Sequence, residues 1–194
     1  MRHPHTLFAA IALSAALVGC SGGEVGETDG RGFNDADAAF ATDMIQHHAQ
    51  ALQMVDLTMG QHLDPAAQDL ADDIRAAQAP EIETMAGWLQ DWDEPVPETV
   101  RDHANAHGDG SDVEMRSDMP GMMSTQDLQS LEDAGRGEFQ TMWLELMVEH
   151  HRGAIEMAEH EIENGEHRQV VALAEGIAKS QDLELSSMQN LLER

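Results

Sequence analysis

The chain has 194 residues, which is enough for one compact domain with a hydrophobic core. Aromatic residues make up only 4% of it and tyrosine is absent, so the composition favours packed helices over β-sheets. The formal net charge of -27 argues against nucleic acid and anionic membrane surfaces as partners, and it favours cations.

The N-terminal residues 1–20 have the pattern of a secretory signal, because a basic start precedes an apolar run too short to span a membrane. Residues 17–20 read LVGC, which resembles the box of bacterial lipoproteins, where the chain is cut before a lipidated cysteine. We expect lipidation of Cys20, a flexible tether over residues 21–32, and attachment to the outer face of a bacterial membrane. An ordinary secretory signal with a free Cys20 is the alternative.

Two stretches of the chain repeat each other at a fixed distance. Residues 44–54 read MIQHHAQALQM, and residues 147–157, which lie 103 positions later, read MVEHHRGAIEM. Further identical pairs occur at the same offset and without a gap, for example Leu70 with Leu173. The chain therefore contains an internal duplication.

The first copy, residues 33–92, predicts a helical hairpin. One helix is expected over residues 35–59, because its apolar positions follow the helical period. Asp64 and Pro65 then suit the cap and the first turn of a second helix. The hairpin begins the bundle domain that we expect over residues 33–194.

A crossover of residues 93–124, rich in Pro, Gly, Asp, His and Met, joins the two copies. A short helix over residues 124–133 is expected to close it. The second copy, residues 125–194, predicts a helix over residues 137–163 and a last helix from residue 166 onward. Two hairpins with a long crossover make an all-α four-helix bundle with approximate two-fold symmetry.

The repeated phrase places histidine and methionine on one face of a helix. Successive residues turn by about 100°, so the two His and two Met of each phrase share a stripe about 120° wide. The repeated Gln, Glu and Met of each second helix share another stripe. Because the apolar members of these stripes must face the core, the His and Glu members are carried inward. The inward candidates are Met44, His47, His48, Met54, Glu81, Met147, His150, His151, Met157 and Glu184.

Buried imidazole and carboxylate groups are costly unless they are hydrogen-bonded or bind a metal. We interpret the set as a metal site, made of one centre for each copy or one shared centre. The alternative is a hydrogen-bond network in which Glu81 and Glu184 orient the imidazoles and the methionines fill the core. Thioethers prefer Cu(I) and similar soft ions, while imidazole also accepts Fe and Zn.

The crossover carries four further methionines in a polar segment, where core packing gives no obvious reason for them. We expect these side chains to be exposed and to make the first contact with copper or silver. The alternative is a disordered segment in which the methionines are incidental. The four methionines are Met115, Met119, Met122 and Met123.

A carboxylate-bridged Fe or Mn centre is the main alternative, because such centres also occupy four-helix bundles. It normally uses Glu-x-x-His pairs, but Met44 and Met147 stand three residues before His47 and His150. No Ser-His-Asp or Cys-His pattern for a nucleophilic enzyme is readable. The sequence thus favours a binding protein over an enzyme, with a di-metal oxidoreductase and a metal-free envelope interaction module as alternatives.

The two phrases, together with MPGMM at residues 119–123, closely resemble the bacterial domain-of-unknown-function family DUF305. The resemblance implies a ferritin-like fold, secretion, and binding of copper or silver for metal tolerance, with a copper-handling protein as a further partner. One departure concerns Gln140, which follows Phe139 where the family often has Asp. Carried over by motif, the implied ligands are Met44, His47, His48, Met54, Met119, Met122, Met123, Met147, His150, His151 and Met157.

Overall fold

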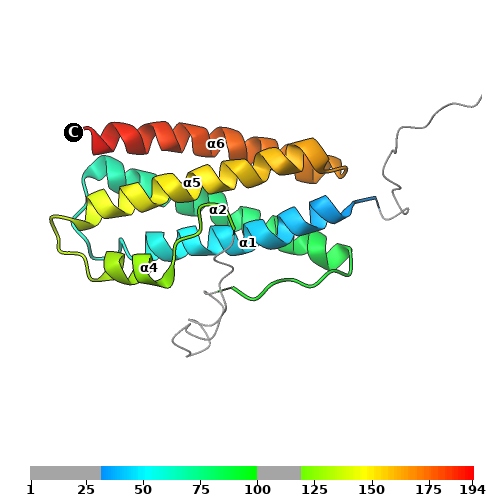
Figure 1. The fold of residues 1–194 in the computed structure, drawn as a ribbon, viewed down its shortest axis with the longest axis horizontal. Helices are drawn as coiled ribbons and strands as arrows, with labels where there is room; N and C mark the ends of the chain where they lie inside the picture. The colour runs from blue at the N-terminus through cyan, green and yellow to red at the C-terminus, as the bar shows by residue number, and fades with distance from the viewer. Residues whose placement is uncertain (1–31, 100–118) are drawn as a thin grey trace, which may run out of the picture.

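The computed structural model describes residues 32–99 and 119–194, so the expected signal, the tether with Cys20 and most of the crossover lie outside the described residues. In the described part the chain forms helices and no strand, which confirms the all-α prediction. Figure 1 shows one antiparallel hairpin of α1 and α2, a second of α5 and α6, and the short α4, which packs against α5. The helices are α1 (Asp35–Asp56), α2 (Pro65–Asp91), α4 (Thr125–Glu132), α5 (Phe139–Asn164) and α6 (Arg168–Leu192).

The helices begin where the local sequence supplies caps. At the start of α1 the Asn34 side chain accepts the Asp37 backbone N–H, and the Asp37 carboxylate accepts the Asn34 backbone N–H. The start of α2 has the Asp64 carboxylate as its cap and Pro65 in its first turn. Ser124 caps α4 in a second reciprocal box, so three of these starts follow from short-range chemistry.

The interior consists of two apolar clusters with a polar layer between them. The first cluster surrounds Phe139 and Trp143 and includes Leu131 of α4. The second cluster surrounds Phe40 and Leu89 near the other end of the bundle. Each long helix contributes to both clusters, and its polar residues fall between its two apolar segments. This central polar layer comprises His47, His48, Gln78, Glu81, His150, His151, Gln181 and Glu184.

Helices pack most extensively within each hairpin, and the α1–α5 pair forms the main contact between the hairpins.

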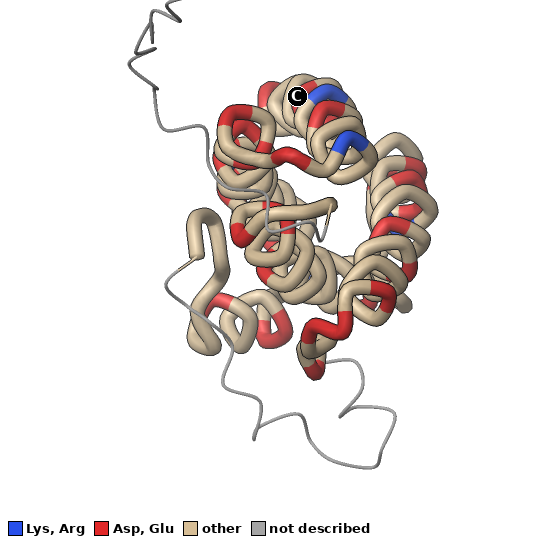
Figure 2. The backbone as a smooth tube through the Cα atoms, turned by 90° about the vertical axis from the view of Figure 1, so that its right-hand side faces the viewer, with Lys and Arg blue, Asp and Glu red and all other residues tan. Residues whose placement is uncertain are grey.

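Figure 2 looks along the bundle and shows acidic positions on the long helices and few basic ones. Among the described residues, no helix combines the length and the apolar character needed to cross a membrane. The negative charge is thus a property of the helical exterior, whereas the four histidines of the layer are fully buried.

Asp37 and Gln140, which are 103 positions apart, perform matching structural roles. The Asp37 carboxylate accepts the backbone N–H groups of Glu166 (3.2 Å) and His167 (2.9 Å), just before α6 begins. The side-chain oxygen of Gln140 accepts the Asp64 backbone N–H (2.6 Å), just before α2 begins. Each first helix therefore anchors the second helix of the other copy, a role that the sequence analysis did not assign to Gln140.

Glu161 of α5 is buried beside Asp37, and neither side chain is exposed. Its burial, followed by the hydrogen bond and the negative charge of Asp37, raises the pKa of Glu161 from 4.5 to about 8. The Asp37 carboxylate itself is held by the backbone N–H groups of Asn34, Glu166 and His167. The contact links α1 to the end of α5.

We expect Glu161→Gln to change the pH dependence of stability. The folded state binds the extra proton more tightly than the unfolded state, so this contribution is complete below the ordinary pKa of 4.5 and is lost as the pH rises towards about 8. Because glutamine is neutral at every pH, the variant should have a higher Tm than the wild type at pH 8 and a similar Tm at pH 4. Thermal unfolding followed by circular dichroism measures both, and parallel pH profiles would contradict the assignment.

Candidate metal centre

His47 of α1 and His150 of α5 meet in the middle of the polar layer. Their ring centroids lie 3.8 Å apart and their ring planes are tilted by 42°. Both side chains are fully buried, as the helical stripe predicts. Since the two residues occupy equivalent positions of the duplication, the two phrases converge on one place, at the approximate two-fold axis.

The second histidine of each phrase pairs with a glutamate of its own hairpin. His48 Nε2 lies 2.8 Å from Glu81 Oε2, and His151 Nε2 lies 2.6 Å from Glu184 Oε2. The glutamate side chains remain 21% and 16% exposed, so the carboxylates reach inward from the edge of the layer. These two pairs match the predicted alternative to a metal site, in which Glu81 and Glu184 orient the imidazoles. The same arrangement also positions metal-binding imidazoles.

The hydrogen bonds show which ring nitrogen donates in three of the four histidines. A carboxylate or carbonyl oxygen only accepts, so Nε2 of His48 and His151 donates to glutamate, and Nε2 of His47 donates to the Pro120 carbonyl oxygen (3.1 Å). In the described part of the chain, Nδ1 of all four histidines and Nε2 of His150 are buried without a hydrogen-bond partner.

Burial keeps the central pair in the form that binds a metal. Burial, and after it the neighbouring His48, lowers the pKa of His47 from 6.5 to about 3. Burial and the surrounding histidines, His47 first among them, also lower the pKa of His150 well below 6.5. Both imidazoles are therefore neutral at physiological pH, and a protein that uses them should keep its metal at a lower pH than one with exposed histidines.

The segment of residues 119–123 lies over the central histidines. Gln50 of α1 holds Met123 by both backbone groups: the Met123 N–H donates to Gln50 Oε1 (2.7 Å), and Gln50 Nε2 donates to the Met123 carbonyl (2.9 Å). The Pro120 carbonyl accepts the hydrogen bond from His47. The MPGMM segment is thus tied to the same helix face that carries the first histidine pair.

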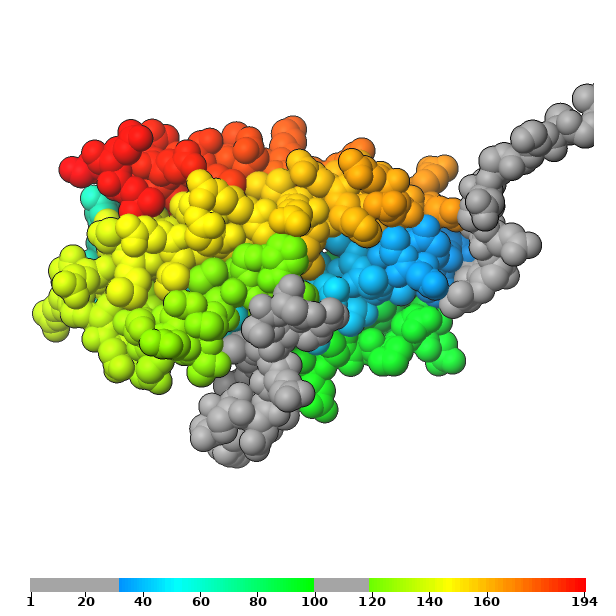
Figure 3. Space-filling view, viewed as in Figure 1, coloured from blue at the N-terminus to red at the C-terminus, as the bar shows by residue number. Residues whose placement is uncertain are grey.

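Two glycines let this segment touch α5. Gly121 has a φ of +72° and packs on α5 so closely that a Cβ would lie 2.7 Å from the Glu149 carbonyl oxygen. On α5 itself, a Cβ at Gly153 would lie 2.1 Å from the Pro120 carbonyl oxygen. Gly153 occupies the position in the second copy that Gln50 occupies in the first. Gln50 therefore binds the segment by hydrogen bonds, whereas Gly153 leaves space for its backbone. Figure 3 shows the green segment crossing from the lime α4 towards the yellow α5.

The methionines divide into three groups by burial. Met44, Met54 and Met147 are fully buried, in agreement with the predicted stripes. Met119 and Met123 are only 6% and 8% exposed, so the expectation of exposed crossover methionines is wrong for these two. The clamp at Gln50 explains the difference, because it fixes their backbone against the bundle. Met122 and Met157 are partly exposed.

Among the residues that the structure describes, no group of three or more His, Cys, Asp or Glu side chains is arranged to hold a metal ion. Glu81 and Glu184 each serve one histidine. A carboxylate-bridged Fe or Mn centre would need such a group.

Sequence reasoning missed Gln50, Gly153 and the Asp37–Glu161 contact. A signal existed for Gly153, because a glycine inside a helix, at the position where the duplicate has Gln, indicates close approach of another backbone. Pro120 and Gly121 are likewise a turn signal. Nothing in the local sequence marks Glu161, since its burial depends on packing between the two copies.

The chain is similar in sequence and in fold to proteins of one family. The family model described as Domain of unknown function (DUF305) matches residues 37–192. A search of curated proteins gave no match. Among solved structures, a DUF305 protein of Streptomyces coelicolor, designated a secreted protein, is 33% identical with a TM-score of 0.69, over 81% of this chain and 92% of that chain.

Two further solved structures extend the comparison. A DUF305 fragment from Deinococcus radiodurans is 25% identical with a TM-score of 0.70, over 83% of this chain and 97% of that chain. CopM in its Cu(I)-bound form is 26% identical with a TM-score of 0.63, over 81% of this chain and 95% of that chain. CopM has also been solved in Cu(II)-bound and Ag-bound forms.

Proposed function

This chain belongs to the DUF305 family, and on that premise we propose that it binds Cu(I) or Ag(I) in its central polar layer, outside the cytoplasm. The metal is cargo, held for sequestration or transfer in metal tolerance. The observation that carries the proposal is the set of buried, unpartnered imidazole lone pairs where His47 meets His150.

The donor chemistry supports a soft monovalent ion. His47 and His150 supply neutral nitrogen donors, and Met44 and Met147 lie one helical turn earlier on the same faces and are fully buried. A buried lone pair without a donor costs about 1–3 kcal/mol, and a bound metal would offset that cost. Thioether and imidazole together favour Cu(I) over Mg²⁺, Ca²⁺ or Mn²⁺, which prefer oxygen ligands.

The surroundings support retention of the ion. His48 and His151, oriented by Glu81 and Glu184, lie next to the central pair and extend the set of nitrogen donors. The MPGMM segment is held against α1 through the hydrogen bonds of Pro120 with His47 and of Met123 with Gln50. The acidic exterior raises the local concentration of cations around the bundle.

Related proteins give independent support for the ion and the location. CopM, at about a quarter identity and with the same fold, holds Cu(I), Cu(II) and Ag in its solved forms. The relative from Streptomyces coelicolor is designated secreted, and residues 1–20 here have the signal pattern. Lipidation at Cys20, anchoring to the membrane and a copper-handling partner protein remain part of the proposal as sequence-based predictions.

An anaerobic Cu(I) titration against a competing chelator tests the proposal. We expect binding much tighter than micromolar, and a rise in Tm on metal addition, because a ligand at about 100 times its Kd stabilises the folded state by about 2.7 kcal/mol. The full chain without its signal, at pH 7 and then at pH 5, is the sample. Micromolar or weaker binding with an unchanged Tm would instead support the metal-free interaction module.

A further inference from the structure

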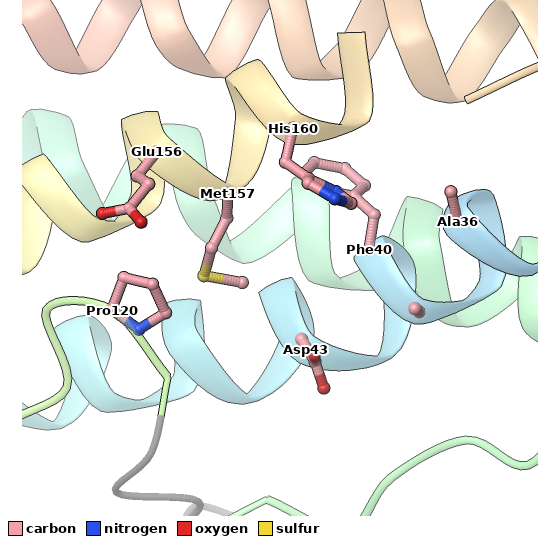
Figure 4. Close-up of a pocket in the computed structure, with 8 residues that line it drawn as sticks. Ala36, Phe40, Asp43, Pro120, Glu156, Met157 and His160 are labelled. Carbon is pink, nitrogen blue, oxygen red and sulfur yellow. The ribbon is translucent and has the colours of Figure 1, made fainter. Parts of the chain in front are cut away.

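A pocket of about 270 Å³ opens on the bundle surface between α1 and α5, beside the MPGMM segment. Figure 4 shows Met157 and His160 of α5 on one side of it, Asp43 of α1 on the other, and Pro120 at one end. In Figure 3 the lime and green segment covers the left part of the line along which α1 and α5 pack, which we call the α1–α5 seam. On the right, blue α1 and orange α5 are in contact and this segment does not cover them. The pocket therefore lies in the half of the seam that α4 does not cover.

The internal duplication explains why this half is hollow. The α1 wall of the pocket includes Ala36 and Ala39, and the duplicate positions in α5 are Phe139 and Met142. Phe139 is buried in the first apolar cluster, and Met142 packs against that cluster. Alanine at the pocket positions leaves unfilled the volume that large apolar side chains occupy in the other half.

The α5 wall differs from its duplicate because it carries an imidazole in place of a leucine and a carboxylate in place of a glutamine. Glu156, Met157 and His160 stand where the first copy has Gln53, Met54 and Leu57. Met54 is fully buried and Leu57 packs against the first cluster. By contrast, Met157 is partly exposed and its sulfur points into the pocket in Figure 4, and His160 is exposed at the rim.

We propose that this pocket is a second binding site, for one soft monovalent cation such as Cu(I) or Ag(I), with the Met157 sulfur and the His160 imidazole as its ligands. The two residues are three positions apart on α5, so they lie on the same helix face. A thioether and an imidazole together select soft ions. The carboxylates of Asp43 and Glu156 line the same pocket and supply negative charge around the ion.

The site is separate from the central polar layer but adjoins it. Pro120 lines the pocket, and its carbonyl oxygen accepts the hydrogen bond from His47. An ion held at Met157 is thus separated from the central histidines by the MPGMM segment. Binding here does not require the central layer to bind copper, because none of its ligands belongs to that layer.

Silver titration of the full-length mature protein in chloride-free buffer tests the second site, since Ag(I) is stable in air. Met157→Leu combined with His160→Gln preserves side-chain volume and should bind one fewer Ag(I) ion than the wild type. The matched control is Met59→Leu with His62→Gln, which changes the same residue types at the same spacing on an exposed turn. The control should bind as many ions as the wild type.

Methyl NMR of the methionine side chains supplies the second readout, because Ag(I) at the pocket should shift the Met157 methyl signal. A variant with His47→Ala and His150→Ala should keep this shift, which distinguishes failure of the pocket from failure of the central layer. The proposal is overturned if the Met157 methyl does not respond to Ag(I), or if the pocket variant and the wild type bind the same number of ions. Loss of one Ag(I) ion in the control variant would overturn it as well, because any exposed His and Met at this spacing would then bind Ag(I) without a pocket.

Discussion

Replacing His47 and His150 together by alanine should weaken Cu(I) binding by at least about 100-fold, because loss of a residue that merely orients a ligand already costs about 10–100-fold. The two ring centroids lie 3.8 Å apart, and both rings have nitrogen atoms that are buried without a hydrogen-bond partner. Removing both leaves only His48 and His151, whose Nε2 atoms are already committed to glutamate. Competition titration with a Cu(I) chelator measures the change.

Two controls make this result interpretable. His62→Ala removes an exposed histidine outside the layer and should leave the affinity unchanged. His47→Gln with His150→Gln removes the imidazoles but retains polar side chains in the layer, so this variant should fold and should also bind Cu(I) weakly. Circular dichroism of the metal-free variants shows whether each of them is folded. Wild-type affinity in a folded double variant would exclude the central pair as the site.

Gly153→Ala should destabilise the protein, although alanine normally stabilises a helix interior relative to glycine. The new Cβ would lie 2.1 Å from the Pro120 carbonyl oxygen, so the MPGMM segment or α5 must move. Overpacking of this kind costs roughly 1–3 kcal/mol. The displaced segment would also lose the hydrogen bond between Pro120 and His47, so we expect weaker copper binding in the same variant.

Gly176→Ala in α6 is the matched control, because nothing lies within 4 Å of a Cβ at that position. Alanine there should stabilise the protein by roughly 0.5–1 kcal/mol, since glycine loses more backbone freedom on folding. Urea unfolding of the two variants should therefore give shifts of opposite sign. If Gly153→Ala were as stabilising as Gly176→Ala, the close contact with the MPGMM segment would not exist in solution.

The helices and their inward faces could be predicted because they depend on short-range chemistry. The caps at Asn34 and Asp64 lie within three residues of the N–H groups that they bind. The four histidines are buried as predicted, because the stripes that carry them also carry the apolar side chains of the core. The duplication extended this reasoning from one hairpin to the other.

The contacts between the copies could not be predicted, because they depend on how two hairpins pack. Nothing in either phrase fixes the distance between His47 and His150, which follows from the α1–α5 contact. Burial of Met119 and Met123 follows from the clamp at Gln50, 73 positions away from Met123. The pocket at Met157 arises where the two copies differ in sequence. It could not be predicted, because its walls come from α1 and α5, and their relative position follows from the packing of the hairpins.

Anomalous diffraction at the copper absorption edge, from crystals of the Cu(I)-loaded protein, tests the central claim most directly. The proposed function predicts an anomalous peak in the polar layer, within bonding distance of a ring nitrogen of both His47 and His150 and of at least one methionine sulfur. A fully loaded crystal with copper only on surface residues, and with the His47 and His150 rings still packed against each other, would contradict it.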